Sequence, residues 1–369
     1  MRIAIDVREL HGKSTGVGRI IRALLAEWGC MPAGQAHEFL QLAPAADARS
    51  GGTVWEQLVL PRVVRQSRAD VLFAPAYSGP VFSSVPMVVL MHDASFAAHP
   101  EWFGWREGLR RRVTARLAAR AADRIITVSE FSKREIVAHL GVAASKIVVM
   151  NPGVTAFRRT TDIARTNLER SSRTCTVLFV GSIFNRRHVP ELIEGFARLA
   201  QSHPEMQLQI VGDNRTSPRV NLDAMVASTG MTDRIHLRSY VPDDALPRLY
   251  ADAAAFVYLS EYEGFGLTPL EALASRVPIV LLDTPVAREI YGDAARYVAR
   301  PDPALVAAAL KSVLFDAAEG ERILKAAPHV LSRYSWATFS EKVLDTLIEV
   351  GSRRTGSEPR AQKVSRETR

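Results

Sequence analysis

Two glutamates, Glu263 and Glu271, stand eight residues apart on either side of a loop that contains Gly264 and Gly266. The loop follows an apolar run at residues 254–259, which predicts a buried strand, and it leads into a helix rich in alanine and leucine. Amide groups at the start of a helix and the positive end of its dipole attract an anion. Carboxylates repel phosphate but accept hydrogen bonds from hydroxyl groups. The loop therefore predicts a ligand with phosphates in its middle and sugar hydroxyls at both ends, which is the shape of a nucleotide sugar.

Glu271 also has a simpler interpretation. Thr268, Pro269 and Glu271 have the spacing of a capping box, with Thr268 as the N-cap, Pro269 as the first helical residue and Glu271 as its partner. A cap would explain Glu271 and would leave Glu263 unexplained. The functional interpretation of the loop therefore depends on Glu263.

Further polar residues follow other predicted strands. Arg186 and Arg187 come soon after an apolar run at residues 176–180, and arginine forks match phosphate geometry. His92 directly follows the apolar run at residues 86–91, and the carboxyl ends of parallel strands are where open α/β sheets bind ligands. A lone histidine there is equally well explained as a structural hydrogen-bonding group.

The elements that must position these residues are alternating strands and helices, which predict parallel sheets covered on both faces. The 369 residues are 47% hydrophobic and 23% charged, which is typical of a globular protein with two domains. The first strand, residues 2–7, leads to a turn with Gly16 and Gly18, and a helix is expected from about Ile20. The turn lacks the third glycine of the dinucleotide fingerprint, which disfavours a dinucleotide oxidoreductase.

A polar stretch from about Thr155 to Arg173 predicts a linker between the domains. We expect an N-terminal domain at residues 1–160 and a nucleotide-sugar-binding domain at residues 161–335. A last helix at residues 336–350 is expected to pack back on the first domain. Residues 351–369 are polar and basic, and they predict a disordered tail.

Cysteine content and hydropathy indicate the compartment. Cys30 and Cys175 are too few for a disulfide framework or a zinc site, which favours a reducing cytoplasm. The chain opens directly on a predicted strand, with no signal sequence in front of it. No apolar run approaches the roughly 20 residues that span a bilayer. We therefore expect a cytoplasmic protein.

The formal net charge is +8, and part of the excess lies in a predicted helix at residues 102–122. Aromatic residues at 102, 103 and 105 precede or open this basic segment. Such a helix can dock on anionic lipid headgroups at the inner membrane face, form a solvated surface, or bind nucleic acid. No nucleic-acid-binding motif accompanies it, so nucleic acid is the least favoured of the three. Its arginines are Arg106, Arg110, Arg111, Arg112, Arg116 and Arg120.

From Ile3 to about Val350 the chain resembles the retaining GT-B glycosyltransferases of family 4. The resemblance implies an α/β fold with two doubly wound, Rossmann-like domains that face a central cleft. The paired glutamates are its most specific feature, and the glycine-containing turn is its least specific one. The matching segments are Asp6–Arg8, Thr15–Arg19, His92–Asp93, His99–Phe103, Thr127–Lys133, Asn151–Val154, Val180–Ser182, Glu263–Glu271, Arg288–Ile290 and Gly292–Ala295.

By this resemblance, the second domain would bind a nucleotide-diphosphate sugar as donor. Glu271 would accept hydrogen bonds from the ribose, and Glu263 would hold hydroxyls of the transferred sugar. The rest of the donor site in this domain would include Tyr240, Val241, Phe265, Gly266 and Leu267.

The resemblance also assigns the diphosphate and the reacting carbon. Arg187 would contact the diphosphate where the family usually has a lysine, and Arg186 would assist it. Ser182 would also belong to the donor site, and it departs from the family pattern because many members have an arginine there. From the first domain, Gly16 would approach the phosphate or the sugar, and His92 would face the transferred sugar.

The implied chemistry is hexose transfer with retention of configuration. In retaining members the leaving phosphate is thought to take the acceptor's proton, so neither a general base nor a cofactor is expected. No acidic metal-binding triplet is evident, and no metal is expected either. The segments at residues 55–57 and 70–75 look like those of bacterial mannosyl- and rhamnosyltransferases, which favours GDP-mannose as donor. The acceptor would be a polysaccharide or lipid-linked intermediate of cell-surface polysaccharide assembly.

Two other functions remain open on the same fold. One is a non-catalytic nucleotide-sugar-binding or scaffold protein, which the presence of both glutamates disfavours. The other is a nucleotide-sugar epimerase, which would need acid and base carboxylates and no acceptor.

Overall fold

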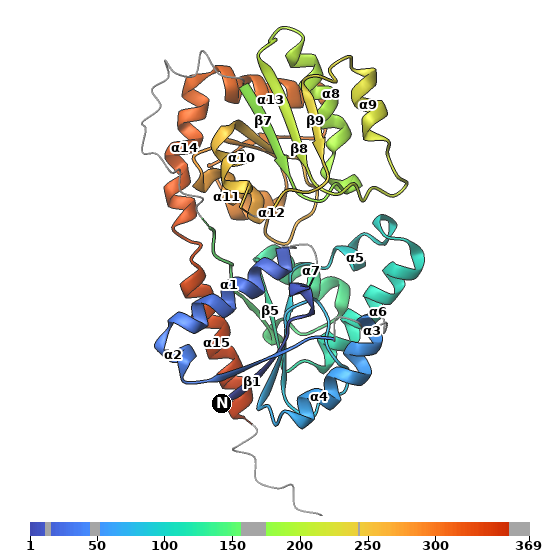
Figure 1. The fold of residues 1–369 in the computed structure, drawn as a ribbon, viewed down its shortest axis with the longest axis vertical. Coiled ribbons are helices and arrows are strands. Elements are labelled where there is room, and N and C mark those ends of the chain that lie inside the picture. The colour runs from blue at the N-terminus through green and yellow to red at the C-terminus, as the bar shows by residue number, and fades with distance from the viewer. Residues whose placement is uncertain (12–15, 45–51, 156–174, 243, 354–369) are drawn as a thin grey trace, which may run out of the picture.

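The computed structural model describes residues 1–11, 16–44, 52–155, 175–242 and 244–353. The chain forms two α/β domains, one above the other in Figure 1, and each contains a six-stranded parallel sheet. The strand order is β2-β1-β3-β4-β5-β6 in the first domain and β12-β11-β10-β7-β8-β9 in the second. The predicted pair of doubly wound α/β domains is confirmed.

The first sheet consists of short apolar strands. Strands β3 and β4 are buried at every position, as expected of parallel strands covered on both faces. The strands are β1 (Arg2–Asp6), β2 (Glu38–Leu42), β3 (Val71–Ala74), β4 (Met87–Met91), β5 (Arg124–Thr127) and β6 (Ile147–Val149). The helices are α1 (Gly16–Cys30), α2 (Pro32–Gln35), α3 (Gly52–Val54), α4 (Leu60–Gln66), α5 (Ser95–Ala98), α6 (Trp105–Ala121) and α7 (Glu130–Leu140).

The second domain repeats this architecture. Its strands are β7 (Cys175–Val180), β8 (Met206–Val211), β9 (Ile235–Arg238), β10 (Ala253–Tyr258), β11 (Ile279–Leu282) and β12 (Arg296–Val298). Its helices are α8 (Val189–Ala200), α9 (Leu222–Ser228), α10 (Leu246–Asp252), α11 (Leu267–Ala274), α12 (Pro285–Tyr291), α13 (Pro303–Phe315) and α14 (Ala317–Leu331).

The order of the second sheet places two loops side by side. Strand β7 pairs with β8 on one side and with β10 on the other, so the strand order reverses between β7 and β10. Ligands of open α/β sheets bind at the carboxyl ends of the strands that flank such a reversal. The segment with Arg186 and Arg187 follows β7, and the segment with Glu263 follows β10.

Several predicted boundaries were wrong. Helix α1 begins at Gly16 rather than about Ile20, so Gly16 and Gly18 are helical residues and not a turn. Helix α6 begins at Trp105, because residues 100–102 form a separate 3-10 turn. Helix α14 was not predicted, since it contains Pro328, a residue that usually ends a helix.

Other predictions lie outside the described residues. The linker falls almost entirely within residues 156–174, and most of the tail falls within residues 354–369. The predicted start of the tail at residue 351 was wrong, because the last helix continues to Ser352. Thr15, the first residue of one matching segment, is also outside the described part of the chain. Among the described helices, none is long and apolar enough to cross a bilayer.

The last helix, α15 (Trp336–Ser352), returns to the first domain and lies beside α1 (Figure 1). The indole Nε1 of buried Trp28 in α1 donates a hydrogen bond to the carbonyl of Ser340 in α15, at 2.9 Å. Trp28 also stacks on Phe39 of β2, with 4.8 Å between ring centroids. One side chain therefore joins three segments that are distant in the sequence.

We expect Trp28→Phe to lower the free energy of unfolding by about 1–2 kcal/mol, because it removes the buried hydrogen bond to Ser340 and some ring volume. Denaturant unfolding measures the change. Trp105→Phe is the matched control, because Trp105 is 72% exposed, and its effect should stay within about 0.5 kcal/mol. An equal loss in both variants would contradict the anchoring role of Trp28.

Candidate functional site

Glu263 lies in the loop after β10, and three side chains converge on its Oε1 atom. Arg187 Nε donates to it at 2.9 Å, Ser260 Oγ at 2.8 Å and Tyr258 Oη at 3.0 Å. Arg187 Nη2 adds a second contact at 2.8 Å. Tyr258 ends β10 and Ser260 follows two residues later, so the strand itself fixes the carboxylate. Sequence reasoning missed both side chains, although their places at the strand end are a usable signal.

Arg187 is held on all sides in a 3-10 turn at Asn185–Arg187, after β7. Its Nη1 donates to the carbonyl of Ser182 at 2.6 Å, and its guanidinium lies 4.9 Å from the ring centroid of Tyr258. Ser182 thus contributes a backbone carbonyl rather than a side chain. Neighbouring Arg186 donates through Nε to the carbonyl of Tyr262 at 3.2 Å.

The electrostatics of this cluster keep both Glu263 and Arg187 in their charged forms. Burial raises the pKa of Glu263, but the guanidiniums of Arg187 and Arg186 outweigh it and hold that pKa below its usual value. Burial lowers the pKa of Arg187, and the charge of Glu263 more than reverses the effect. Both groups are therefore charged at neutral pH.

Glu271 is placed by α11, and its partners argue against the capping box. The helix begins at Leu267, its N-cap is Gly266 with φ of 87°, and no side chain caps it. Glu271 is almost fully buried and accepts a hydrogen bond from Tyr250 Oη of α10, at 3.1 Å. Thr268 is already helical, so the interpretation of Glu271 as its capping partner was wrong.

The cation that pairs with Glu271 comes from the other domain. Arg19, in the first turn of α1, donates to Glu271 Oε1 and forms an ion pair with it. The two residues are separated by 252 positions in the sequence. Sequence reasoning quoted Arg19 as part of a motif but gave it no role.

The domains also meet through Gly264, next to Glu263. Ser129 Oγ, at the N-cap of α7, donates to the carbonyl of Gly264 at 2.6 Å. A Cβ atom at Gly264 would lie 1.9 Å from the carbonyl oxygen of His92. Only glycine therefore permits this approach of the two backbones.

A second set of contacts between the domains involves α7 and an aromatic cluster. The Glu289 carboxylate of α12 accepts hydrogen bonds from the amides of Glu130 and Phe131, at 2.7 and 2.9 Å. The ring of Tyr262 packs edge-on against Trp102 and His99 of the first domain. These contacts place the loop after β10 firmly against the first domain.

His92 is buried, and its Nε2 lies 2.9 Å from the carbonyl oxygen of Pro75. Burial lowers the pKa of His92, so the ring is neutral and donates this hydrogen bond. One ring nitrogen is thus committed within the first domain. The backbone of His92, rather than that nitrogen, meets the second domain at Gly264.

The remaining predicted residues surround this centre. Gly16 is the exposed first residue of α1, and no atom lies within 4 Å of the position of a Cβ there. Phe265 is buried edge-on against Tyr334, and Leu267 is the first residue of α11. Tyr240 is 46% exposed in the segment after β9.

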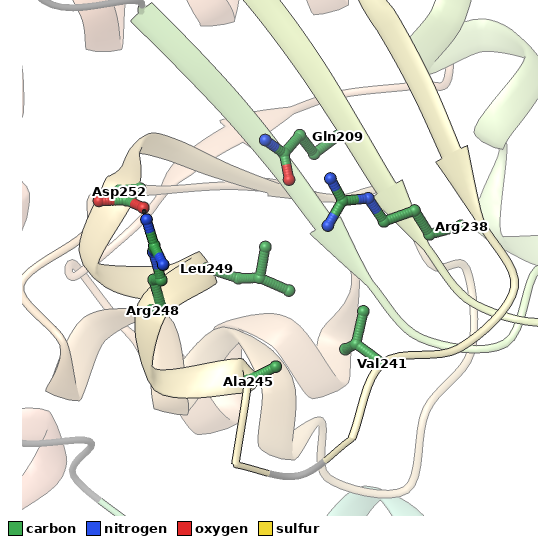
Figure 2. Close-up of a pocket in the computed structure, with 7 residues that line it drawn as sticks. All are labelled: Gln209, Arg238, Val241, Ala245, Arg248, Leu249 and Asp252. Carbon is green, nitrogen blue, oxygen red and sulfur yellow. Dashed lines mark ion pairs between the residues drawn. The ribbon is translucent and has the colours of Figure 1, made fainter.

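A pocket of about 290 Å³ lies between the β8–β9 face of the sheet and α10 (Figure 2). Val241 lines it, together with Gln209 and Arg238. The Oε1 atom of Gln209 is buried there without a hydrogen-bond partner. Leu249, on the opposite wall, precedes Tyr250, the residue that binds Glu271. The pocket is therefore linked to the Glu271 end of the site through α10.

Beside Glu263 itself, a cavity of only about 20 Å³ is lined by Tyr258, Ser260 and Phe265, among others. This volume suits about one water molecule. Arg187, Tyr258 and Ser260 occupy the surroundings of the carboxylate. A sugar would require these groups to move.

The segments at residues 6–8 and 55–57 form a separate polar cluster in the first domain. Arg8 pairs with Asp6 at 2.9 Å and with buried Glu56, and its guanidinium lies 5.6 Å from the ring centroid of Trp55. Burial raises the pKa of Asp6 to about 6. Trp55 and Glu56 are therefore explained by packing within this domain, which weakens their value as indicators of a donor sugar.

Within the described residues, no group of three or more His, Cys, Asp or Glu side chains is placed to hold a metal ion. The expectation that the reaction needs no metal stays a prediction.

We expect Gly264→Ala to separate the domains, because the added methyl group would collide with the carbonyl of His92. Small-angle X-ray scattering should give a larger radius of gyration, while circular dichroism should stay unchanged. Gly29→Ala is the matched control, because nothing lies within 4 Å of its Cβ position. An unchanged radius for Gly264→Ala would contradict this interface.

Comparison with known proteins covers both domains. Residues 161–330 match the family model of group 1 glycosyl transferases, and residues 24–156 match that of glycosyltransferase family 4. HepE from Anabaena, solved in complex with UDP and glucose, has a similar fold. The TM-score is 0.72 at 19% identity, covering 95% of this chain and 100% of that one.

Two curated relatives are more similar in sequence. D-inositol 3-phosphate glycosyltransferase of Acidothermus cellulolyticus is 30% identical over 65% of this chain and 56% of its own length. O-antigen chain mannosyltransferase B of Escherichia coli is 29% identical over 56% of this chain and 55% of its own length. The chain thus spans about half the length of these relatives. The first domain thus matches the family 4 glycosyltransferase model and the second domain matches the group 1 glycosyl transferase model, in an architecture shared with HepE.

Proposed function

We propose that this protein is a retaining glycosyltransferase that takes a hexose from a nucleotide-diphosphate sugar. The observation that carries the proposal is the pairing of Glu263 with Arg187 at the point where the order of the second sheet reverses. The Glu263 carboxylate suits sugar hydroxyls and the Arg187 guanidinium suits phosphate. The two groups are directly hydrogen-bonded to each other. A scaffold protein has no need to keep this charged pair half-buried.

Both glutamates are already paired with arginines, Glu263 with Arg187 and Glu271 with Arg19. A nucleotide sugar offers new partners to both glutamates and to Arg187. Its hydroxyls suit the carboxylates, and its diphosphate suits the guanidiniums. Donor binding is therefore an exchange of partners, in which Glu271 takes the ribose, Glu263 takes the sugar, and Arg187 and Arg186 take the diphosphate.

The chemistry of transfer follows from charge. The bond between the anomeric carbon and the phosphate oxygen breaks, and positive charge develops on the sugar ring. The arginines stabilise the departing diphosphate electrostatically. A phosphate oxygen then takes the proton of the acceptor hydroxyl as that hydroxyl attacks the same face. A neutral His92 fits a role in hydrogen bonding better than one as a general base.

The donor that we propose is GDP-mannose, supported by the similarity to an O-antigen mannosyltransferase. The D-inositol 3-phosphate glycosyltransferase and the UDP-bound HepE represent other donors and acceptors. The proposed acceptor is a saccharide or lipid-linked intermediate of cell-surface polysaccharide assembly. An epimerase on the same fold is the alternative, and turnover without any acceptor would favour it.

A thermal-shift panel of GDP-, UDP-, dTDP- and ADP-sugars, followed by turnover with the best binder, tests the proposal. A shift with one nucleotide class and transfer of its sugar would support it. The absence of a shift with every nucleotide sugar would overturn it.

Glu263→Gln should abolish sugar transfer yet keep nucleoside diphosphate binding within about threefold, because Glu263 contacts the sugar and not the nucleotide. Glu271→Gln should weaken nucleoside diphosphate binding about tenfold by losing the ribose contact. Calorimetry and radiolabelled transfer measure the two effects. Exposed Glu341 provides the control variant Glu341→Gln, which should change neither. Equal effects of the two site variants on nucleotide binding would contradict the assignment.

Arg19→Ala should strengthen the binding of a nucleoside that lacks phosphates, because Arg19 competes with the ribose for Glu271. A partly exposed ion pair is worth about 1 kcal/mol, which corresponds to about fivefold in affinity. Arg187→Ala provides the contrast, since it should weaken diphosphate binding and leave nucleoside binding unchanged. Titration of both variants with guanosine and GDP measures this. Weaker guanosine binding by Arg19→Ala would refute the competition.

A further inference from the structure

Helix α6 buries small residues and exposes large apolar ones, which is the reverse of the usual arrangement. The residues that it buries are small, namely Gly108, Ala115, Ala118 and Ala119. Its large apolar residues point outward instead: Trp105 is 72% exposed, Leu109 48%, Val113 46% and Leu117 39%. A helix whose outer face serves only solvent normally has the opposite distribution.

The outward residues form one stripe, because each follows the previous one by four positions and such residues are neighbours on a helix surface. Isolated apolar residues on a surface are ordinary, but a contiguous stripe marks a surface that contacts a partner. A solvated face, one of the explanations left open by the sequence, does not account for this stripe.

The charge of α6 indicates which partner fits. The helix carries six arginines and one acidic residue, Glu107. Arg112 lies three positions from Leu109, Arg116 lies three positions from Val113, and the two arginines are four positions apart, so they interleave with the apolar stripe. Arg116 also donates through Nη2 to the carbonyl of His139 at 2.9 Å. The guanidinium of Arg106 lies 5.0 Å from the ring centroid of Trp105. Arginine beside exposed tryptophan and leucine suits an interface that is anionic outside and apolar beneath.

The surface extends beyond α6. Arg110 Nη1 donates to Thr53 Oγ1 at 3.1 Å, which ties α6 to α3, the neighbouring helix in Figure 1. Val54 and Leu58 in that segment are 50% and 55% exposed. The apolar surface is therefore broader than a single helix.

Two of the aromatic residues noted in the sequence lie elsewhere. Trp102 stacks on His99 with 3.9 Å between ring centroids, and it packs against Tyr262 of the second domain. Phe103 is partly buried, so Trp105 is the aromatic residue of the exposed stripe. Because Trp102 comes just before α6, the exposed face begins beside the contact between the two domains.

We infer that the outer face of α6, defined by Trp105, Leu109, Val113 and Leu117 with its arginines, docks on an anionic lipid bilayer. The apolar stripe lies at the boundary of headgroups and acyl chains, and the arginines contact lipid phosphates. The docking deepens the proposed function, because it would hold the domain interface near a lipid-linked acceptor. Docking on the bilayer is measured without donor or acceptor, so its test is independent of the test of sugar transfer.

Cosedimentation with phosphatidylcholine vesicles, with and without phosphatidylglycerol, tests the inference. We expect binding to require phosphatidylglycerol and to decrease as salt increases. The double variant Leu109→Ser with Val113→Ser should lose about tenfold in vesicle affinity, and Arg112→Gln with Arg116→Gln a similar factor. Phe315→Ser is the matched control, because Phe315 is 43% exposed on α13 of the other domain, and its binding should be unchanged.

Tryptophan fluorescence reports which residue enters the bilayer. The emission should shift to the blue on addition of phosphatidylglycerol vesicles, and Trp105→Phe should remove most of that shift. Circular dichroism of each variant separates lost docking from lost folding.

Binding that ignores both phosphatidylglycerol and salt would overturn the inference. So would a concentration-dependent dimer in sedimentation that Leu109→Ser with Val113→Ser abolishes, because a second copy would then cover the stripe. Vesicle binding by a protein that fails the nucleotide-sugar panel would leave the docking intact and remove the proposed function alone.

Discussion

Two carboxylates, buried Glu271 and half-buried Glu263, are each paired with an arginine, and this is the constraint on which the site depends. Glu263 pairs with Arg187 inside the second domain, and Glu271 pairs with Arg19 across the two domains. Removal of either arginine would leave a carboxylate with little access to water and no counterion, which is unfavourable unless another partner replaces the arginine. Each glutamate therefore needs a cation or a set of hydroxyl groups in every state that the protein occupies.

The surrounding structure meets this requirement with rigid elements. Neighbouring strands β7 and β10 bring Arg187 and Glu263 together at their carboxyl ends, and Tyr258 and Ser260 hold the carboxylate in place. Gly264 then allows the first domain to approach closely enough for contacts between the domains. Because one of the two ion pairs crosses the interface, a ligand that takes over Glu271 also changes what holds the domains together. The site and the domain arrangement are thus energetically coupled.

The outer surface of the first domain follows a different physical logic. In the sheets, large apolar side chains are inside, and α6 reverses this with alanine and glycine inward and tryptophan, leucine and valine outward. Small inward residues let the helix pack closely on the domain, and the large residues stay exposed. Trp102 belongs to the interface between the domains although it lies only three residues before Trp105. The exposed stripe of α6 and the contact between the two domains are therefore adjacent along the chain.

The sequence by itself determined the strands, the two-domain architecture and the set of charged residues at the strand ends. Buried parallel strands are continuous apolar runs. A residue that follows such a run lies at the carboxyl end of its strand, independently of how distant segments fold. Glu263, Arg187 and His92 were found in this way. The partners of these residues depend instead on segments far apart in the sequence. Only the tertiary structure decided that Arg19 meets Glu271, that His92 donates to Pro75, and that α11 begins one residue before Thr268. The tertiary structure also decided which face of α6 is exposed. A helical pattern of small and large residues does not indicate which of the two faces packs on the domain.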